Sequence, residues 1–157
     1  MKRVKKIYVL ILCLLFVYLA AFIGSIFSSA NVDSEWYGSV KPAITPPSWV
    51  FPVVWNILFF LIGLSLFFAW IKSNKKQKTK VAILFSINLF LNVLWSFLFF
   101  FLQNPTLAFA DLILLGFSII AIILFVKKIE KKSALLLVPY LLWISFAGIL
   151  NYLIAFR

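Results

Sequence analysis

The residue types that most often carry catalysis or bind metals are nearly missing from this chain. It has no histidine, one cysteine and four acidic residues among 157. The lack of histidine excludes His-ligated haem, most zinc sites and any Ser-His or Cys-His catalytic pair. Cys13 has no second cysteine with which to form an intramolecular disulfide. With no paired carboxylates for acid–base hydrolysis, we expect no metal site and no cofactor.

A second set of candidates consists of polar side chains inside long apolar runs, where polar groups are costly and need a reason. Asn88 and Asn92 are four residues apart and share one helix face, which Trp95 and Ser96 continue. These asparagines fit a ligand site, and they fit equally well hydrogen bonds that join neighbouring helices. For Asp111, early in the next apolar run, we favour a structural role, because a carboxylate is stabilised near a helix N-terminus.

The chain also has six tryptophans, and their positions divide them into two groups. Three lie near the ends of apolar runs, where interfacial tryptophans are common: Trp36, Trp49 and Trp70. Three lie deeper, where each indole N–H needs a partner: Trp55, Trp95 and Trp143. Together with the nearby amides, the deeper indoles predict a cavity for a flat aromatic ligand. Ordinary core packing is the alternative.

The elements that carry these residues are predicted from composition and run length. Hydrophobic residues make up 65% of the chain and the mean hydropathy is +1.12, whereas soluble domains are usually about 45–50% apolar. Five apolar runs each have roughly the 20 residues that a helix needs to cross a bilayer: 7–27, 49–71, 81–102, 106–126 and 134–156. We therefore predict an all-α polytopic membrane protein, in which residues 1–157 form a single domain of five transmembrane helices.

The connections between the runs carry turn and capping signals. Prolines in the longest connection, 28–48, forbid a long helix there. Asn104 and Pro105 are typical of an N-cap and a first helical residue, and Pro139 is expected to interrupt the last run. The first run follows a basic start, but it is longer than the roughly 7–15 apolar residues of a signal peptide. We expect it to be a retained helix.

Basic residues are strongly biased to one side of the predicted helices. Four lie in 2–6, five in 72–80 and four in 127–132, so thirteen of the fifteen share one side, against Lys41 and Arg157 on the other. By the positive-inside rule, the N-terminus is cytoplasmic, and the C-terminus and the long first loop are outside. The net charge of +11 thus indicates orientation and anionic lipid headgroups, and we expect no nucleic acid as a partner. The compact, lysine-rich loops indicate a bacterial cell membrane.

Several short motifs, in order along nearly the whole chain, resemble those of the translocator protein / tryptophan-rich sensory protein (TspO/MBR) family, also called the peripheral-type benzodiazepine receptor family. The motifs are Trp36-Tyr37, Lys41-Pro42, Thr45-Pro46-Pro47 with Trp55 eight residues on, Asn88-Leu89-x-Leu91-Asn92-x-x-Trp95-Ser96, Ala108-x-x-Asp111, and Pro139-Tyr140-Leu141-x-Trp143-x-x-Phe146-Ala147-x-x-Leu150-Asn151-Tyr152. Each motif alone is weak, but together they are highly specific.

The resemblance implies a five-helix bundle with a cavity, roofed by the first loop, for hydrophobic ligands. Family ligands include porphyrins and, in animal members, cholesterol and synthetic isoquinoline carboxamides. With the deep amides and indoles added, the predicted ligand-binding residues are Trp36, Tyr37, Trp55, Asn88, Asn92, Trp95, Trp143 and Ala147. Some bacterial members are reported to degrade protoporphyrin in light, and in that case the resemblance implies catalytic roles for Trp55 and Trp143.

We therefore predict an integral membrane receptor or sensor that binds protoporphyrin-type tetrapyrroles in an aromatic pocket, rather than an enzyme. Two alternatives stay open: an enzyme that degrades porphyrin oxidatively in light, and a tetrapyrrole transporter. Five helices with no visible inverted repeat argue against alternating access. Small residues four apart, Ala82 with Ser86 or Ser65 with Ala69, allow close approach of helices and predict a homodimer.

The predicted orientation can be tested with reporter fusions. A reporter that is active only in the cytoplasm should work when it is fused after Lys6 or Lys76 and should be silent after Arg157, because the basic segments stay on the cytoplasmic side. Cytoplasmic activity of the Arg157 fusion would contradict the orientation.

Overall fold

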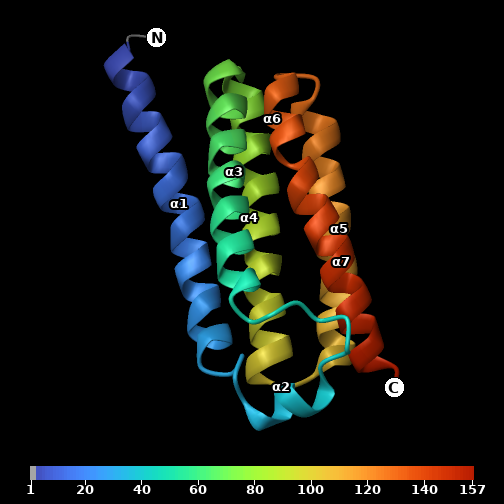
Figure 1. Ribbon diagram of the computed structural model, residues 1–157. Coiled ribbons are helices and arrows are strands. Elements are labelled where there is room, and N and C mark those ends of the chain that lie inside the picture. The colour runs from blue at the N-terminus through green and yellow to red at the C-terminus, as the bar shows by residue number, and fades with distance from the viewer. Residues whose placement is uncertain (1–2) are drawn as a thin grey trace.

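The computed structural model describes residues 3–157, and five long helical spans dominate it (Figure 1). The elements in chain order are α1 (Arg3–Ser29), α2 (Glu35–Val40), α3 (Val50–Lys72), α4 (Lys75–Ser96), the π-helix η1 (Phe97–Phe101), α5 (Pro105–Val126), α6 (Lys131–Leu136) and α7 (Val138–Ala155). No strand occurs within the described residues. The spans formed by α1, α3, α4 with η1, α5, and α6 with α7 are each long and apolar enough to cross a membrane. The prediction of an all-α membrane protein with five spans is confirmed.

The second connection is shorter than the sequence predicts. The third span was expected from residue 81, after a basic loop over 72–80, whereas α4 already begins at Lys75. Asn74 explains the difference, because its side chain accepts a hydrogen bond from the Gln77 N–H (3.0 Å) while Gln77 Oε1 accepts one from the Asn74 N–H (2.9 Å). This capping box starts a helix, and the lysines that follow are good helix formers.

Two further predictions about helix ends agree with the structure. Asn104 accepts a hydrogen bond from the Leu107 N–H (3.0 Å), and Pro105 is the first residue of α5. The last span is interrupted at Leu137, two residues before Pro139, because the proline ring displaces the carbonyl one turn earlier. Both predictions are confirmed.

A short helix inside the long first loop was not predicted. Helix α2 begins after Ser34, whose hydroxyl accepts a hydrogen bond from the Tyr37 N–H (3.2 Å). Proline excludes a long helix from this loop, but the first proline, Pro42, comes only after α2 has ended. The prolines therefore limit the helix to the first part of the loop.

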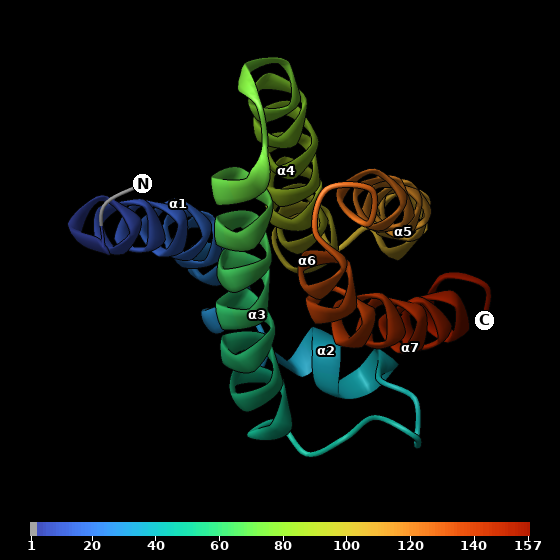
Figure 2. The same ribbon diagram turned by 90° about the horizontal axis from the view of Figure 1, so that it is seen from above.

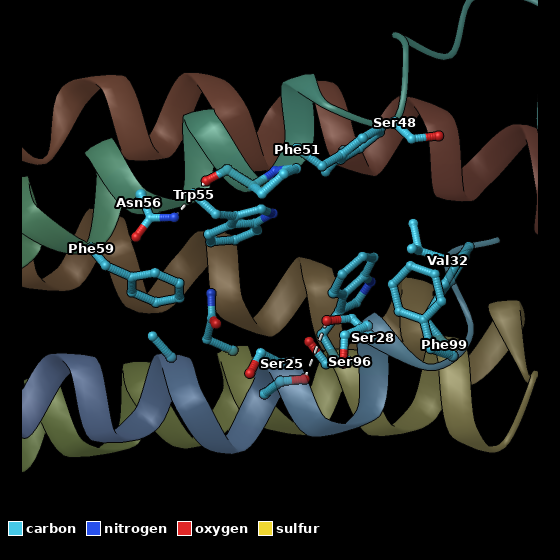
Figure 3. A pocket seen from close by; sticks show the side chains of 18 of the residues that line it. Ser25, Ser28, Val32, Ser48, Phe51, Trp55, Asn56, Phe59, Ser96 and Phe99 are labelled. Carbon is cyan, nitrogen blue, oxygen red and sulfur yellow. Dashed lines mark hydrogen bonds between the residues drawn. The ribbon is translucent and has the colours of Figure 1, made fainter.

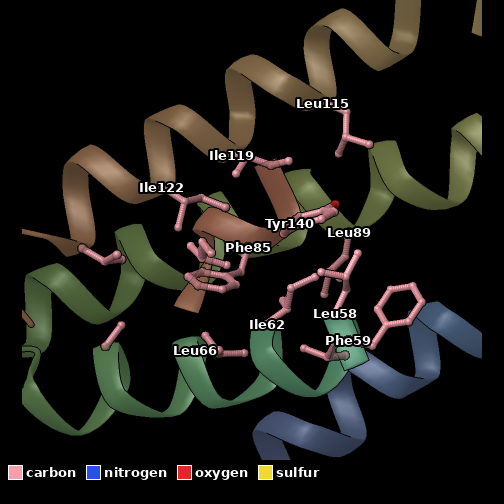
Figure 4. Close-up of a cluster of buried hydrophobic side chains, with 14 of the residues drawn as sticks. Leu58, Phe59, Ile62, Leu66, Phe85, Leu89, Leu115, Ile119, Ile122 and Tyr140 are labelled. Carbon is pink, nitrogen blue, oxygen red and sulfur yellow. The ribbon is translucent and has the colours of Figure 1, made fainter. Parts of the chain in front are cut away.

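The spans form a ring when the bundle is seen from above (Figure 2). Helix α1 packs against α3 and α4, α4 against α5, α5 against α7, and α6 against α3. Helix α1 starts at one end of the bundle, and α2 and the C-terminus lie at the other (Figure 1). Ile62, Phe85, Ile119 and Tyr140 are buried between the helices (Figure 4). Large apolar side chains such as Phe117 are exposed on the outer surface, as expected where a bundle faces lipid.

A glycine on α3 permits close contact with α1. A Cβ added to Gly63 would lie 2.6 Å from Leu14 Cδ2 and 3.5 Å from Leu14 Cα. Any side chain at this position would have to displace the end of the Leu14 side chain, and a bulky one would also crowd the backbone of α1. The glycine therefore leaves room for Leu14 between α1 and α3.

Ser65, two residues after Gly63 on α3, forms hydrogen bonds with Ser133 of the same chain. Ser65 is fully buried, and its hydroxyl lies 2.9 Å from the hydroxyl of Ser133 in α6. Ala69, four residues later, is fully buried too. This pair is therefore used inside the bundle and does not join two copies, which leaves Ala82 with Ser86 as the predicted contact of a homodimer.

The close contact at Gly63 can be tested by enlarging the side chain. Gly63→Ile should destabilise the fold by about 1–3 kcal/mol, the usual cost of overpacking. The measurement is the midpoint of thermal unfolding in detergent. Gly116→Ile is the matched control, because a Cβ at Gly116 meets no atom within 4 Å. Equal midpoints for the two variants would show that α1 does not depend on this contact.

Candidate functional site

A cavity of about 480 Å³ lies inside the bundle at the end where α2 is found (Figure 3). Its walls come from α1, α3, α4 and α7, and residues of α2 and η1 close its end. These elements come from the N-terminal, middle and C-terminal parts of the chain. The volume falls within the range of about 300–1,000 Å³ that small-molecule pockets usually have.

Flat aromatic rings cover much of the cavity wall. On α3, Trp55 stacks with Phe59 at a centroid distance of 5.3 Å and an interplanar angle of 27°. On α4 and η1, Trp95 stacks with Phe99 at 5.2 Å and 19°. Further aromatic residues in the lining are Tyr18, Phe22, Tyr37, Phe51 and Phe100. Two stacked pairs on different helices give the cavity broad, flat and apolar faces.

The end of the cavity nearest α2 is closed by an aromatic cluster. Tyr37 is only 8% exposed, and its ring makes edge contacts with Phe99 (6.0 Å between ring centroids) and with Phe100 (5.6 Å). Trp36 contacts Phe99 as well, at 5.6 Å. Burial raises the pKa of the Tyr37 phenol above its usual value, so this hydroxyl stays neutral. We call these four rings the roof of the cavity.

The opposite end of the cavity is closed by a hydrogen-bond network, which we call the floor. Asn92 Nδ2 donates to Tyr140 Oη (3.1 Å), and Tyr140 Oη donates to Asn88 Oδ1 (3.3 Å). Asn88 Nδ2 in turn donates to Ser118 Oγ (2.8 Å). The network joins α4, α7 and α5. Both asparagines therefore join helices through hydrogen bonds, and Asn92 also lines the cavity, whereas Asn88 does not.

A second polar link fixes Trp95. Its indole Nε1 donates to Asn151 Oδ1 of α7 (3.0 Å), and Asn151 Nδ2 donates to the carbonyl of Pro105 (2.7 Å). The ring of Trp95 is therefore held by both α4 and α7. A ring held in place costs less conformational entropy when a ligand stacks on it.

The polar groups in the lining are all uncharged. Hydroxyl, amide and phenol side chains contribute to it, while no Lys, Arg, Asp or Glu of the described chain does. The hydroxyl of Ser25 donates to the carbonyl of Phe22 (2.7 Å), and that of Ser28 to the carbonyl of Gly24 (3.4 Å). Their oxygen lone pairs stay available as weak acceptors. The lining therefore offers aromatic surface and uncharged polar groups, and no charged group of the described residues.

The structure brings together five of the eight predicted ligand-binding residues. The cavity is lined by Tyr37, Trp55, Asn92, Trp95 and Ala147. The other three, Trp36, Asn88 and Trp143, do not line it. Trp36 belongs to the roof and Asn88 to the floor network. The binding roles of all eight stay predictions.

Trp143 lies elsewhere than we expected. We expected its indole to face the same cavity as Trp55, but Trp143 instead contacts Phe51 (5.9 Å) and Phe146 (5.6 Å). Phe51 lines the cavity, so Trp143 supports the wall through that ring. Ala147 and Asn151, four and eight residues further on α7, do line the cavity. Because the three residues share one helix face, their spacing alone could not have separated Trp143 from the other two.

Sequence reasoning missed the contribution of α1. Gly24, Ser25 and Ser28 line the cavity together with Ala21. Small and hydroxyl residues three to four apart inside an apolar run were the available signal, because they share one helix face. The stretch resembles an ordinary close-packing face, and the sequence does not say what lies against it.

The helix dipole does not explain why the carboxylate of Asp111 is buried in α5. It is 4% exposed, and neither carboxylate oxygen has a hydrogen-bond partner among the described residues. The dipole effect is confined to the first turn of a helix, whereas Asp111 follows Pro105, the first residue of α5, by six positions. The helix dipole therefore does not account for Asp111, and its structural role stays a prediction. The residue does not line the cavity.

Comparisons with known proteins agree with this arrangement. A family model described as the TspO/MBR family matches residues 12–157. This chain belongs to the TspO/MBR family. The family assignment confirms the resemblance seen in the motifs.

Named members of the TspO/MBR family are similar over most of their length. A tryptophan-rich protein TspO of Archaeoglobus fulgidus is 41% identical over 145 residues, which are 92% of this chain and 94% of that protein. A tryptophan-rich protein TspO of Chlorobaculum tepidum is 40% identical over 153 residues, 96% of each chain. A translocator protein of sheep, Ovis aries, is 34% identical over 121 residues, 75% of this chain and 72% of that protein.

The floor can be tested by removing one hydroxyl. Tyr140→Phe leaves the amides of Asn88 and Asn92 without their common partner, so we expect a loss of about 1 kcal/mol in stability, as for other interhelical hydrogen bonds in membranes. Thermal unfolding in detergent measures it. Tyr152→Phe is the control, because Tyr152 is exposed on the same helix. A wild-type midpoint for Tyr140→Phe would mean that the network adds nothing to stability.

Proposed function

We propose that this protein is an integral membrane receptor or sensor that binds tetrapyrroles of the protoporphyrin type, and other flat hydrophobic molecules, in the cavity beneath α2. The observation that carries this proposal is a cavity of about 480 Å³ with stacked indole and phenyl rings on two helices and no charged lining residue. A porphyrin is a large, planar, aromatic molecule, and such faces favour stacking. Membership of the TspO/MBR family is consistent with this proposal.

Two polar groups in the cavity provide orientation. Trp55 Nε1 makes no hydrogen bond with the described residues, and its N–H is thus available to an acceptor on the ligand. Asn92 uses its amide nitrogen for Tyr140, which leaves its oxygen as an acceptor. A few well-placed polar groups in an apolar pocket are what fixes the orientation of a small ligand.

We further propose that the end of the bundle with α2 faces outward and that the N-terminus is cytoplasmic. The bias of basic residues supports this orientation, since 72–80 and 127–132 lie at the end opposite α2 (Figure 1). The protein would then reside in the bacterial cell membrane. A homodimer would use the outer face of α4, where Ser86 is exposed and Ala82 half-buried.

The proposal is tested by titrating protoporphyrin into the purified protein in darkness and following the quenching of tryptophan fluorescence. Saturable quenching with an unchanged porphyrin absorption spectrum is expected for a receptor. Absence of saturable quenching would contradict the proposal. A repeat in light separates the enzyme alternative, because degradation would produce a new spectrum that depends on the protein.

Trp55→Ala should weaken porphyrin binding by about tenfold. An aromatic pair contributes about 0.5–1.5 kcal/mol beyond its buried area, and 1.4 kcal/mol is a factor of ten. Trp143→Ala should have a smaller effect, because Trp143 acts only through Phe51. Trp70→Phe is the control, since Trp70 lies in the last turn of α3 near Lys78 (5.6 Å), away from the cavity. Loss of binding in Trp143→Ala with none in Trp55→Ala would place the ligand elsewhere.

A further inference from the structure

A cluster of buried side chains lies at each end of the cavity. At the roof, Tyr37 is buried against Phe99 and Phe100. At the floor, Tyr140 is 1% exposed and bonded to Asn92. A ligand that entered along the axis of the bundle would have to break one of these two clusters.

The side of the cavity is different, because several lining residues also lie on the outer surface of the protein. Phe22 of α1 is 65% exposed and Tyr18 is 37% exposed, and both line the cavity. Ser25 on the same helix is exposed, as are Pro52 and Asn56 on α3. Figure 3 shows Ser25 and Asn56 on these two elements, on facing sides of the cavity.

The other walls contain no such residues. From α4 and η1 the lining residues are Asn92, Trp95, Ser96, Phe99 and Phe100, and from α7 they are Ala147, Leu150, Asn151 and Ile154. Each of these is buried or half-buried. The exposed part of the lining is thus confined to α1, α3 and the segment that leads into α3. It marks a side opening between α1 and α3.

One hydrogen bond forms the edge of this opening that is farther from α2. Tyr18 Oη of α1 donates to the backbone carbonyl of Asn56 on α3 (3.2 Å). Beyond that bond, toward the start of α1, the contact between Gly63 and Leu14 brings the two helices together. The helices are therefore joined on one side of the bond and separated by the cavity on the other.

We propose that hydrophobic ligands reach the cavity sideways from the bilayer, through the opening between α1 and α3. The inference rests on the proposed function, since it assumes a ligand in this cavity. Both helices are membrane spans, so the opening faces lipid, and a molecule dissolved in the hydrocarbon would reach it without crossing water. The uncharged lining matches a ligand of this kind. The bond between Tyr18 and Asn56 joins the helices that border this route.

Cross-linking tests the route. In a Cys13→Ala background, Tyr18→Cys with Asn56→Cys allows a short, reducible, bifunctional thiol reagent to tie α1 to α3 across the edge of the opening. The protein is placed in lipid discs, and the association rate of protoporphyrin is followed by tryptophan quenching before linking, after linking and after reduction. We expect the linked form to lose rapid association and the reduced form to recover it. A monofunctional reagent on the same cysteines adds bulk without joining the helices, so the linked form is expected to associate more slowly than this singly modified form.

The matched control is a cross-link at the end of the bundle where α2 lies. Arg157 Nη1 donates to the carbonyl of Ser39 (3.4 Å), so Ser39→Cys with Arg157→Cys links α2 to the C-terminus, and neither residue lines the cavity. This link should leave association rapid. Rapid association with the side linked, or slow association only with the roof linked, would overturn the side route while leaving the proposed function standing. If even the unlinked proteins failed to bind protoporphyrin, the proposed function would fail and this inference with it.

Discussion

The hydroxyl of Tyr140 holds the polar centre of this bundle together. In hydrocarbon, a buried amide without a hydrogen-bond partner is destabilising, because no water is present to form the missing bond. Tyr140 accepts a hydrogen bond from Asn92 and donates one to Asn88, and Asn88 continues to Ser118. One phenol thus satisfies two amides and joins three helices. The position of Asn92 at the end of this network sets the floor of the cavity.

The bundle has one firmly linked side and one weakly linked side. Helices α4, α5 and α7 share the Tyr140 network and the bonds of Asn151. In the described chain, one hydrogen bond, from the Tyr18 hydroxyl to the Asn56 carbonyl, joins α1 to α3. Apolar packing between helices in lipid gains no hydrophobic driving force, so such a contact separates more easily than a hydrogen-bonded one. The cavity lies between the two sides, with one stacked aromatic pair on α3, another on α4 and η1, and its exposed border on α1 and α3.

Much of the fold could be predicted from the sequence, because run length and charge are one-dimensional signals. Five spans, the cap at Asn104 and the break before Pro139 all follow from local rules. Asn92, Trp55 and Trp95 were placed near the ligand by motif and spacing, and they line the cavity. The position of Trp143 was beyond such rules, since the direction of an indole depends on how α7 turns against α3. The sequence also did not predict that α1 lines the cavity, because an apolar run does not indicate which of its faces contacts lipid and which contacts a cavity.

The π-helix η1 shows how a small change in backbone geometry completes the site. The Leu102 N–H bonds the Phe97 carbonyl (2.9 Å), five residues back instead of four. This wider turn, of a kind often found at functional sites, follows directly after Trp95 and Ser96. Phe99 and Phe100 are both buried and both contact Tyr37, while Trp95 still stacks on Phe99. A run of five residues that are nearly all phenylalanine has no polar pattern to indicate such a turn. In the folded protein, the turn brings two neighbouring rings to the roof, and the roof in turn leaves the side of the bundle as the open border of the cavity.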